Sequence, residues 1–140
     1  MFLQTDPRFP VEVNKEGCGL VSLFYIAFDR AGRKATIEEL LEYYRDMVEN
    51  GIIRKDCYIN SWGDALAFLG IPNSYVGWET PSYICKRDEV EILQFLNPSN
   101  QFKHFVVGDG NGKVVFDPIG KSRTVAVGHL FSKRIFRIGA

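Results

Sequence analysis

The sequence has 140 residues, of which 46% are hydrophobic and 24% are charged, with 17 lysines and arginines against 17 aspartates and glutamates. This length and composition predict one globular domain with a core of its own. The balanced charge gives no electrostatic footprint for nucleic acid or for a membrane surface, so neither is expected as a partner. No signal peptide or membrane-spanning run is recognised, which predicts a cytoplasmic protein.

Three cysteines are present, together with only two histidines. The odd number of cysteines argues against a disulfide framework, and no pair has the Cys-x-x-Cys spacing of a zinc site. Neither a metal nor another cofactor is therefore expected.

Helices are predicted in the first half of the chain. The apolar segment Leu20–Phe28 is typical of a helix buried on most sides. Thr36 and Glu39 form a capping box in front of a second helix with 3.6-residue periodicity, which ends at Asn50-Gly51. Ser61 is expected to cap a short third helix.

The second half is predicted to contain one more helix and then mainly strands. Asp88 is expected to cap a helix through Glu89–Leu96. Strands are predicted at Asn73–Trp78, Ser82–Cys85, Phe102–Gly108, Lys113–Asp117, Arg123–Val127 and Ser132–Ile138. Helices followed by an antiparallel sheet predict an α+β fold. Within the last strand, Lys133-Arg134 is interpreted as an exposed pair of charges.

Cys18 stands between two glycines, directly before the apolar segment that begins at Leu20. It is therefore expected in the first turn of that helix, where unpaired backbone N–H groups and the helix dipole favour a thiolate. Gly17 and Gly19 would let backbone amides approach the sulfur closely, as the binding of an oxyanion requires. The commoner role of a lone cysteine at a helix start is structural, so catalysis needs a partner.

A hairpin supplies that partner. Asp109–Gly112 is a turn signal that joins two segments. The first segment begins with His104, and the second ends with Asp117. The predicted register puts residue 108 opposite 113, and His104 opposite Asp117 on one face. The carboxylate would hold one imidazole nitrogen and leave the other to activate a thiol. The alternative is a surface His–Asp pair without a function.

Four segments in this order carry a family resemblance: Gln4-x-Asp6-Pro7-Arg8-Phe9, Gly17-Cys18-Gly19-x-x-Ser22, His104-Phe-Val-Val-Gly108 and Phe116-Asp117-Pro118. They resemble the bacteriocin-leader-peptidase-like branch of the papain-like cysteine peptidases, from Phe2 to about Gly120. The resemblance implies a papain-like fold, in which a buried helix carrying the cysteine packs on a C-terminal antiparallel sheet. It also implies a Cys18–His104–Asp117 triad that cleaves a peptide or protein substrate through an acyl-enzyme.

The sequence departs from that family at one position. The resemblance implies an oxyanion-stabilising glutamine about six residues before the cysteine, where this chain has Glu12. Asn14 is the nearest side-chain amide and is the candidate replacement, while Gln4 lies far back in the sequence. Loss of an amide donor would lower the rate by on the order of 10²–10³.

Two further functions therefore stay open beside the peptidase. The same residues suit amide or acyl transfer, and an inactive papain-like domain would bind a peptide or a protein. Among the remaining polar side chains, His129 is expected to be structural, and Cys57 and Cys85 are expected to be buried or incidental thiols.

Overall fold

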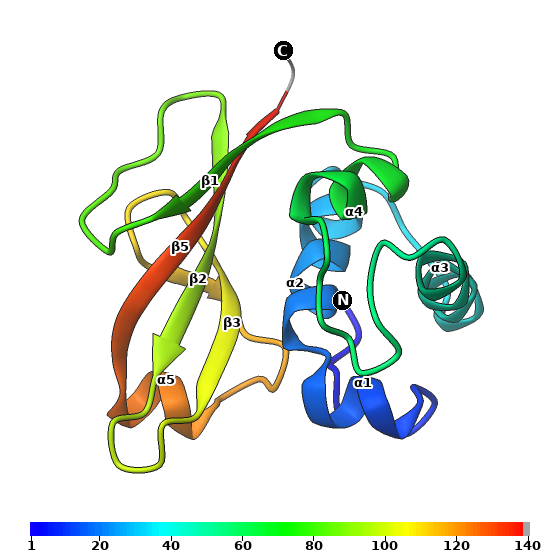
Figure 1. Ribbon diagram of the computed structural model, residues 1–140, viewed down its shortest axis with the longest axis horizontal. Coiled ribbons are helices and arrows are strands. Elements are labelled where there is room, and N and C mark those ends of the chain that lie inside the picture. The colour runs from blue at the N-terminus through cyan, green and yellow to red at the C-terminus, as the bar shows by residue number, and fades with distance from the viewer. Residues whose placement is uncertain (139–140) are drawn as a thin grey trace.

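The computed structural model describes residues 1–138, which form an α+β fold (Figure 1). The helices are α1 (Val11–Glu16), α2 (Cys18–Phe24), the π-helix η1 (Tyr25–Asp29), α3 (Ile37–Glu49), α4 (Trp62–Phe68) and α5 (Arg123–Val127). The strands are β1 (Asn73–Glu79), β2 (Glu89–Leu96), β3 (Lys103–Gly108), β4 (Val114–Phe116) and β5 (His129–Ile138). The α+β class predicted from the sequence is confirmed. Among these residues, no helix is both long enough and apolar enough to cross a membrane.

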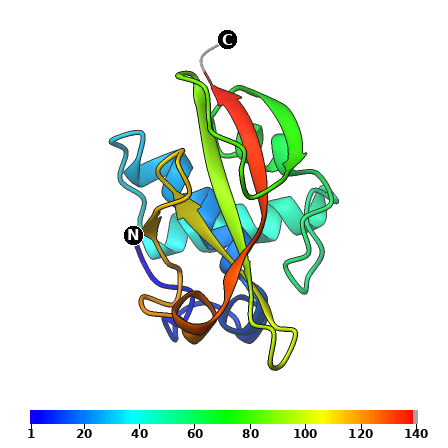
Figure 2. The ribbon, with the colours of Figure 1, turned by 90° about the vertical axis from the view of Figure 1, so that its left-hand side faces the viewer.

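The five strands are antiparallel and lie in the order β1-β5-β2-β3-β4 (Figures 1 and 2). Edge strand β4 has three residues and pairs with β3 only at Val107 and Gly108, with an irregularity between them. The part of β3 that precedes Val107 is therefore unpaired on that side. Helix α2 packs against β3, and the first residue of α2 contacts this free part of the strand.

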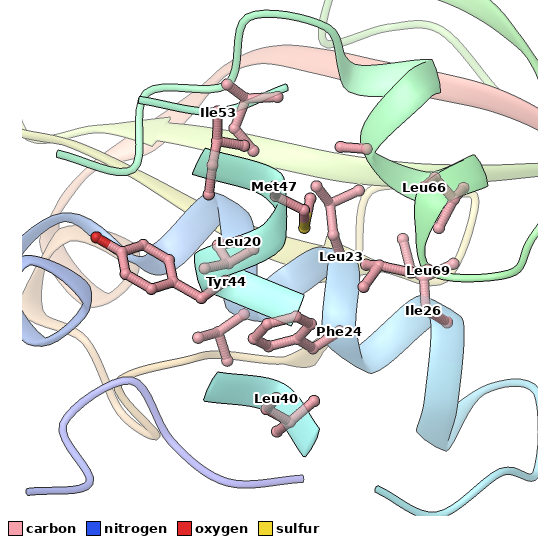
Figure 3. Close-up of a cluster of buried hydrophobic side chains, with 14 of the residues drawn as sticks. Leu20, Leu23, Phe24, Ile26, Leu40, Tyr44, Met47, Ile53, Leu66 and Leu69 are labelled. Carbon is pink, nitrogen blue, oxygen red and sulfur yellow. The ribbon is translucent and has the colours of Figure 1, made fainter. Parts of the chain in front are cut away.

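Helices α2 and η1 run together through the predicted buried segment and form the centre of the hydrophobic core. Figure 3 shows their apolar side chains packed against α3, α4 and the loop that follows α3. The labelled residues are Leu20, Leu23, Phe24, Ile26, Leu40, Tyr44, Met47, Ile53, Leu66 and Leu69. Because α2 is fixed on every side, the position of its first turn is fixed as well.

The predicted capping box of α3 is confirmed. Thr36 Oγ1 accepts a hydrogen bond from the Glu39 N–H at 3.1 Å, and Glu39 Oε1 accepts one from the Thr36 N–H at the same distance. Helix α4 begins after Ser61 as predicted, although the Ser61 side chain makes no capping hydrogen bond.

The helix predicted over Glu89–Leu96, with Asp88 as its cap, is wrong, because this segment forms the central strand β2. Ile92 belongs to the hydrophobic core on the helical side. Glu91 is completely buried and pairs with the equally buried Lys133 of β5 at 2.9 Å. Glutamate, leucine and glutamine have a high intrinsic helix propensity, and the tertiary pairing of this segment overrides it.

Two of the predicted strands are also wrong. Arg123–Val127 forms α5, because Ser122 caps it by accepting a hydrogen bond from the Val125 N–H at 3.3 Å. Ser82–Cys85 has no regular structure. The strand predicted from Ser132 begins three residues earlier, at His129.

Candidate functional site

Cys18 is the first residue of α2, which confirms its predicted place at the start of a helix. The residue is partly exposed. Helix α1 ends at Glu16 and α2 begins at Cys18, so Gly17 alone separates the two helices. The N–H groups of the first helical turn have no acceptor within their own helix. The backbone N–H of Cys18 is one of them, and it lies next to the thiol in the chain.

Close packing excludes a side chain at Gly17 and leaves little room for one at Gly19. A Cβ atom on Gly17 would clash with the carbonyl oxygen and the side chain of Val13. A Cβ atom on Gly19 would lie 3.2 Å from the Trp62 ring and 3.3 Å from Ile59. Glycine at these positions therefore lets α1 and the wall formed by Trp62 approach the thiol closely.

The predicted register of the hairpin is wrong. The structure pairs Gly108 with Val114 and Val107 with Phe116, so the partners are shifted from those predicted. Continuing this register past the end of β4 places Asp117 beside Val106, diagonal to His104 on the same face. Diagonal neighbours in a sheet remain within reach of long side chains.

His104 and Asp117 are nevertheless in contact. Nε2 of His104 lies 2.8 Å from Oδ1 of Asp117, and the two residues are 1% and 8% exposed. The carboxylate also accepts hydrogen bonds from the backbone N–H groups of Ile119 at 2.9 Å and Ser122 at 3.0 Å. Burial by itself would raise the pKa of Asp117, but the hydrogen bonds from His104, Ser122 and Ile119 hold it well below its usual range.

The other imidazole nitrogen, Nδ1, is not used in the contact with Asp117. Nδ1 of His104 is buried and has no hydrogen-bond partner of ordinary geometry within residues 1–138. Burial lowers the pKa of His104, but the interactions with Asp117 and with the Cys18 sulfur more than offset this and raise it to about 9. The imidazole is therefore poised to carry a proton at neutral pH, between a carboxylate on one side and a thiol near the other.

The Cys18 sulfur is held at the edge of the sheet. It accepts a hydrogen bond from the backbone N–H of Phe105 at 3.5 Å. This N–H lies on the side of β3 that the short strand β4 leaves free. The sulfur is thus tied to the residue that follows His104 in the chain, which brings the three predicted catalytic residues together.

The side-chain amide of Asn14 is committed elsewhere. Its Nδ2 donates hydrogen bonds to the backbone oxygens of Gln4 at 2.7 Å and Asp6 at 2.9 Å, which uses both of its N–H groups. Asn14 therefore anchors the N-terminal segment and has no donor left for an oxyanion. Glu12 carries no amide, and its carboxylate lies 3.9 Å from the Lys55 ammonium.

Gln4 is a residue whose place in the site the sequence did not reveal. It is 2% exposed, and its backbone N–H donates to the Pro118 oxygen at 2.9 Å. Its side-chain Nε2 donates at 3.2 Å to the carbonyl of Asn14, which in an unbroken helix would be the acceptor for the Cys18 N–H. Gln4 thereby joins the segment before Cys18 to the segment after Asp117, a link between three distant parts of the sequence.

A cleft of about 450 Å³ opens beside Cys18. Its lining includes side chains from α4, β2, β3 and β5, among them Trp62, Gln94, Lys103, Phe105 and Arg134. The interpretation of Lys133-Arg134 as an exposed pair is wrong, because Lys133 is fully buried and Arg134 is half-buried in this wall. The alternation of the strand that begins at His129 is the signal that assigns these two side chains to opposite faces.

The remaining candidates lie apart from this arrangement. His129 is exposed at the start of β5. Burial raises the pKa of the Cys57 and Cys85 thiols to about 12, so both are protonated at neutral pH. Within residues 1–138, no group of three or more His, Cys, Asp or Glu side chains is placed to hold a metal ion.

A family model matches residues 1–138, nearly the whole chain. No curated protein and no solved structure matches the sequence or the fold. By this match, the chain belongs to the family described as "Protein of unknown function, DUF261".

Proposed function

We propose that this chain is a papain-like cysteine peptidase, in which Cys18 is the nucleophile, His104 the general acid and base, and Asp117 the residue that orients the imidazole. The observation that carries the proposal is the buried 2.8 Å contact of His104 Nε2 with Asp117, which leaves Nδ1 for the thiol. The packing of the cysteine-bearing helix against an antiparallel sheet supports the papain-like assignment. So does the order of the three residues along the chain.

In the proposed acylation step, the Cys18 thiolate attacks the carbonyl carbon of the scissile peptide bond. The resulting tetrahedral oxyanion collapses as the C–N bond breaks, and the imidazolium of His104 gives its proton to the leaving amine. A thioester then joins the acyl part of the substrate to Cys18. The raised pKa of His104, about 9, suits acylation, because the imidazole begins the step protonated at neutral pH and can give this proton to the leaving amine.

Hydrolysis of the thioester completes the cycle. Neutral His104 takes a proton from a water molecule, whose oxygen attacks the thioester carbon. The C–S bond then breaks, which releases the carboxylic acid and returns Cys18 to the thiolate with His104 protonated. Asp117 keeps the imidazole in one orientation throughout and is not itself protonated.

The oxyanion would be bound by the backbone N–H of Cys18 in this proposal, because Glu12 and Asn14 supply no free amide. This N–H lies in the first turn of α2 and points along the helix toward its N-terminal end, where the dipole favours negative charge. If no side-chain amide joins this N–H, the rate would be lower by on the order of 10²–10³ than in an enzyme with a complete oxyanion hole.

The same observation favours a second function of a different class. A domain without a side-chain oxyanion donor would keep the papain-like cleft and bind a peptide or protein without cleaving it. In that case Gly19 and Trp62 would shape a recognition groove, and Cys18 would line this groove without a chemical role.

A peptide-library cleavage screen separates the two functions. Wild type and Cys18→Ser are incubated with the library and the fragments are identified by mass spectrometry, with a peptide electrophile as a parallel active-site label. Peptidase activity predicts cleavage and labelling of Cys18 by the wild type, and neither by the variant. Retention of library peptides by both proteins, without cleavage or labelling, would instead support the binding domain.

A further inference from the structure

Arg134 is the charged side chain of β5 that enters the cleft beside Cys18. It lines the same 450 Å³ space as the thiol, together with Gln94 of β2 and Phe105 of β3. Its neighbours in the strand, Lys133 and Ile135, are fully buried. Arg134 therefore presents a positive charge within the same cleft as the proposed nucleophile.

Three aromatic rings and one hydroxyl hold the guanidinium in place. Its Cζ atom lies 5.8 Å from the Trp62 ring centroid, 5.4 Å from that of Phe105 and 5.9 Å from that of Trp78. Nη1 donates a hydrogen bond to Ser132 Oγ at 2.9 Å. A guanidinium fixed in this way loses little conformational entropy when it binds a ligand.

The guanidinium has no anionic partner. Among residues 1–138, no carboxylate lies within 4.0 Å of Arg134, although the other half-buried arginine of β5, Arg137, faces both Asp88 and Glu89. An arginine has five N–H donors, and the hydrogen bond to Ser132 uses one of them. Burial lowers the pKa of Arg134, a cost that an anion in the cleft would offset.

The charges around the cleft are divided between its walls. Arg134 and Lys103 come from the sheet, whereas Glu16 and Asp56 come from the helical side. An anionic group in the cleft is therefore attracted to the sheet wall and repelled from the helical wall. This polarity gives a bound peptide a preferred direction.

We propose that Arg134 is an anion subsite that binds a carboxylate of the substrate, supplied by an acidic side chain or by the C-terminus of the peptide. The inference rests on the proposed peptidase function and names its substrate class. A guanidinium can bind a carboxylate through two parallel N–H···O hydrogen bonds, which fixes the position of the peptide as well as its charge. Lys103 would add a second, exposed positive charge on the same wall.

Two alkylating reagents of nearly equal size test the subsite through the thiol itself. Iodoacetate carries a carboxylate and iodoacetamide is neutral, so the ratio of their rate constants at Cys18 reports attraction of an anion into the cleft. This ratio is measured by mass spectrometry of Cys18 in wild type, Arg134→Gln, Arg134→Lys and the matched control Arg137→Gln. We expect Arg134→Gln to lower the ratio by about fivefold or more, whereas Arg134→Lys and Arg137→Gln largely preserve it.

The two possible failures are distinguishable. If both reagents modify Cys18 but the ratio is the same in wild type and Arg134→Gln, the subsite is overturned and the proposed peptidase stands. If neither reagent modifies Cys18 in the wild type, the proposed function is overturned, and the subsite that rests on it falls with it.

Cleaved peptides from the library then identify the source of the carboxylate. A cleaved peptide that contains an acidic residue is made in three forms. The first keeps the acidic side chain and has an amidated C-terminus. The second has the corresponding amide side chain and a free C-terminus, and the third lacks both carboxylates. Preference for the first assigns the subsite to a side chain, and preference for the second assigns it to the C-terminus. Equal cleavage of all three contradicts the proposal.

Discussion

The Asp117 carboxylate lies 2.8 Å from Nε2 of His104, although the two residues are not opposite each other in the β3–β4 ladder. The contact is diagonal, and the turn after β4 holds the carboxylate in position for it. In this turn the carboxylate accepts the backbone N–H groups of Ile119 and Ser122. The position of Asp117 therefore depends on a local turn as well as on strand pairing.

Replacement of Asp117 by asparagine tests its orienting role. The amide keeps the size of the side chain but removes the charge and favours the wrong imidazole tautomer, so we expect kcat for peptide cleavage to fall by on the order of 10²–10⁴. The control is Asp64→Asn, an exposed residue in the first turn of α4, which should stay within about twofold of wild type. A loss of less than about threefold in Asp117→Asn would show that the carboxylate does not orient the base.

The ionisation of His104 should be visible in the pH dependence of stability. Its pKa is raised from 6.5 to about 9 in the folded protein, so its stabilising contribution is complete below pH 6.5 and is lost as the pH rises through about 9. The pKa of Asp117 is lowered, so its contribution is present above pH 3.8 and is lost only at lower pH, as the carboxylate is protonated.

We therefore expect the difference in unfolding free energy between wild type and His104→Gln to be largest between about pH 4 and 6.5, and to shrink toward pH 9. Denaturant unfolding at a series of pH values measures this difference, and NMR titration of the imidazole gives the pKa directly. A His104 that titrates near 6.5 would contradict the proposed contacts with Asp117 and Cys18.

Asn14→Ala distinguishes an anchoring role from an oxyanion role. The substitution removes hydrogen bonds to the Gln4 and Asp6 carbonyls, and we expect it to lower the free energy of unfolding by about 2 kcal/mol. Asn60→Ala is the matched control, because it removes a single exposed hydrogen bond to Gly51 and should have an effect below about 1 kcal/mol. Unchanged stability with a 10²-fold or greater loss of kcat would instead make Asn14 the oxyanion donor.

The buried pair of Lys133 and Glu91 should be the most sensitive polar contact in the fold. Both side chains are fully buried, and Glu91 also accepts the backbone N–H groups of Gly110 and Gly112 at 2.9 Å each. Lys133→Met leaves the carboxylate without its cation, so we expect a loss of about 3–5 kcal/mol in urea unfolding. The exposed control Lys121→Met should change stability by less than about 0.5 kcal/mol, and an equally small effect of Lys133→Met would contradict this account.

The parts of the fold that the sequence predicts are those that depend on nearby residues. The capping box of α3 joins residues three positions apart, and the buried helix after Cys18 follows from one continuous apolar segment. The nearness of His104 and Asp117 follows in the same way from a single hairpin, although the predicted register of that hairpin is wrong.

The errors arise where distant residues decide the structure. The strand β2 depends on a Glu91–Lys133 pair 42 residues apart, which no local pattern contains. The same carboxylate holds Gly110 and Gly112, 19 and 21 residues away, in the turn where the predicted register is wrong. The link from Gln4 to Asn14 and Pro118 is likewise a product of tertiary folding.

The rate of Cys18 alkylation against pH shows directly whether Cys18 and His104 act as a thiolate–imidazolium pair. Iodoacetamide is used on wild type and His104→Ala, with Cys57 and Cys85 as internal controls, because burial raises the pKa of both to about 12. Circular dichroism verifies that the variant is folded.

We expect Cys18 of the wild type to react at a substantial rate at pH 6–7, where the two control thiols are almost inert. His104→Ala should slow the Cys18 reaction about tenfold or more in this range, because the thiolate loses its cationic partner. A Cys18 rate that follows the ionisation of an ordinary thiol and is the same in His104→Ala would contradict the catalytic pair and favour the binding domain.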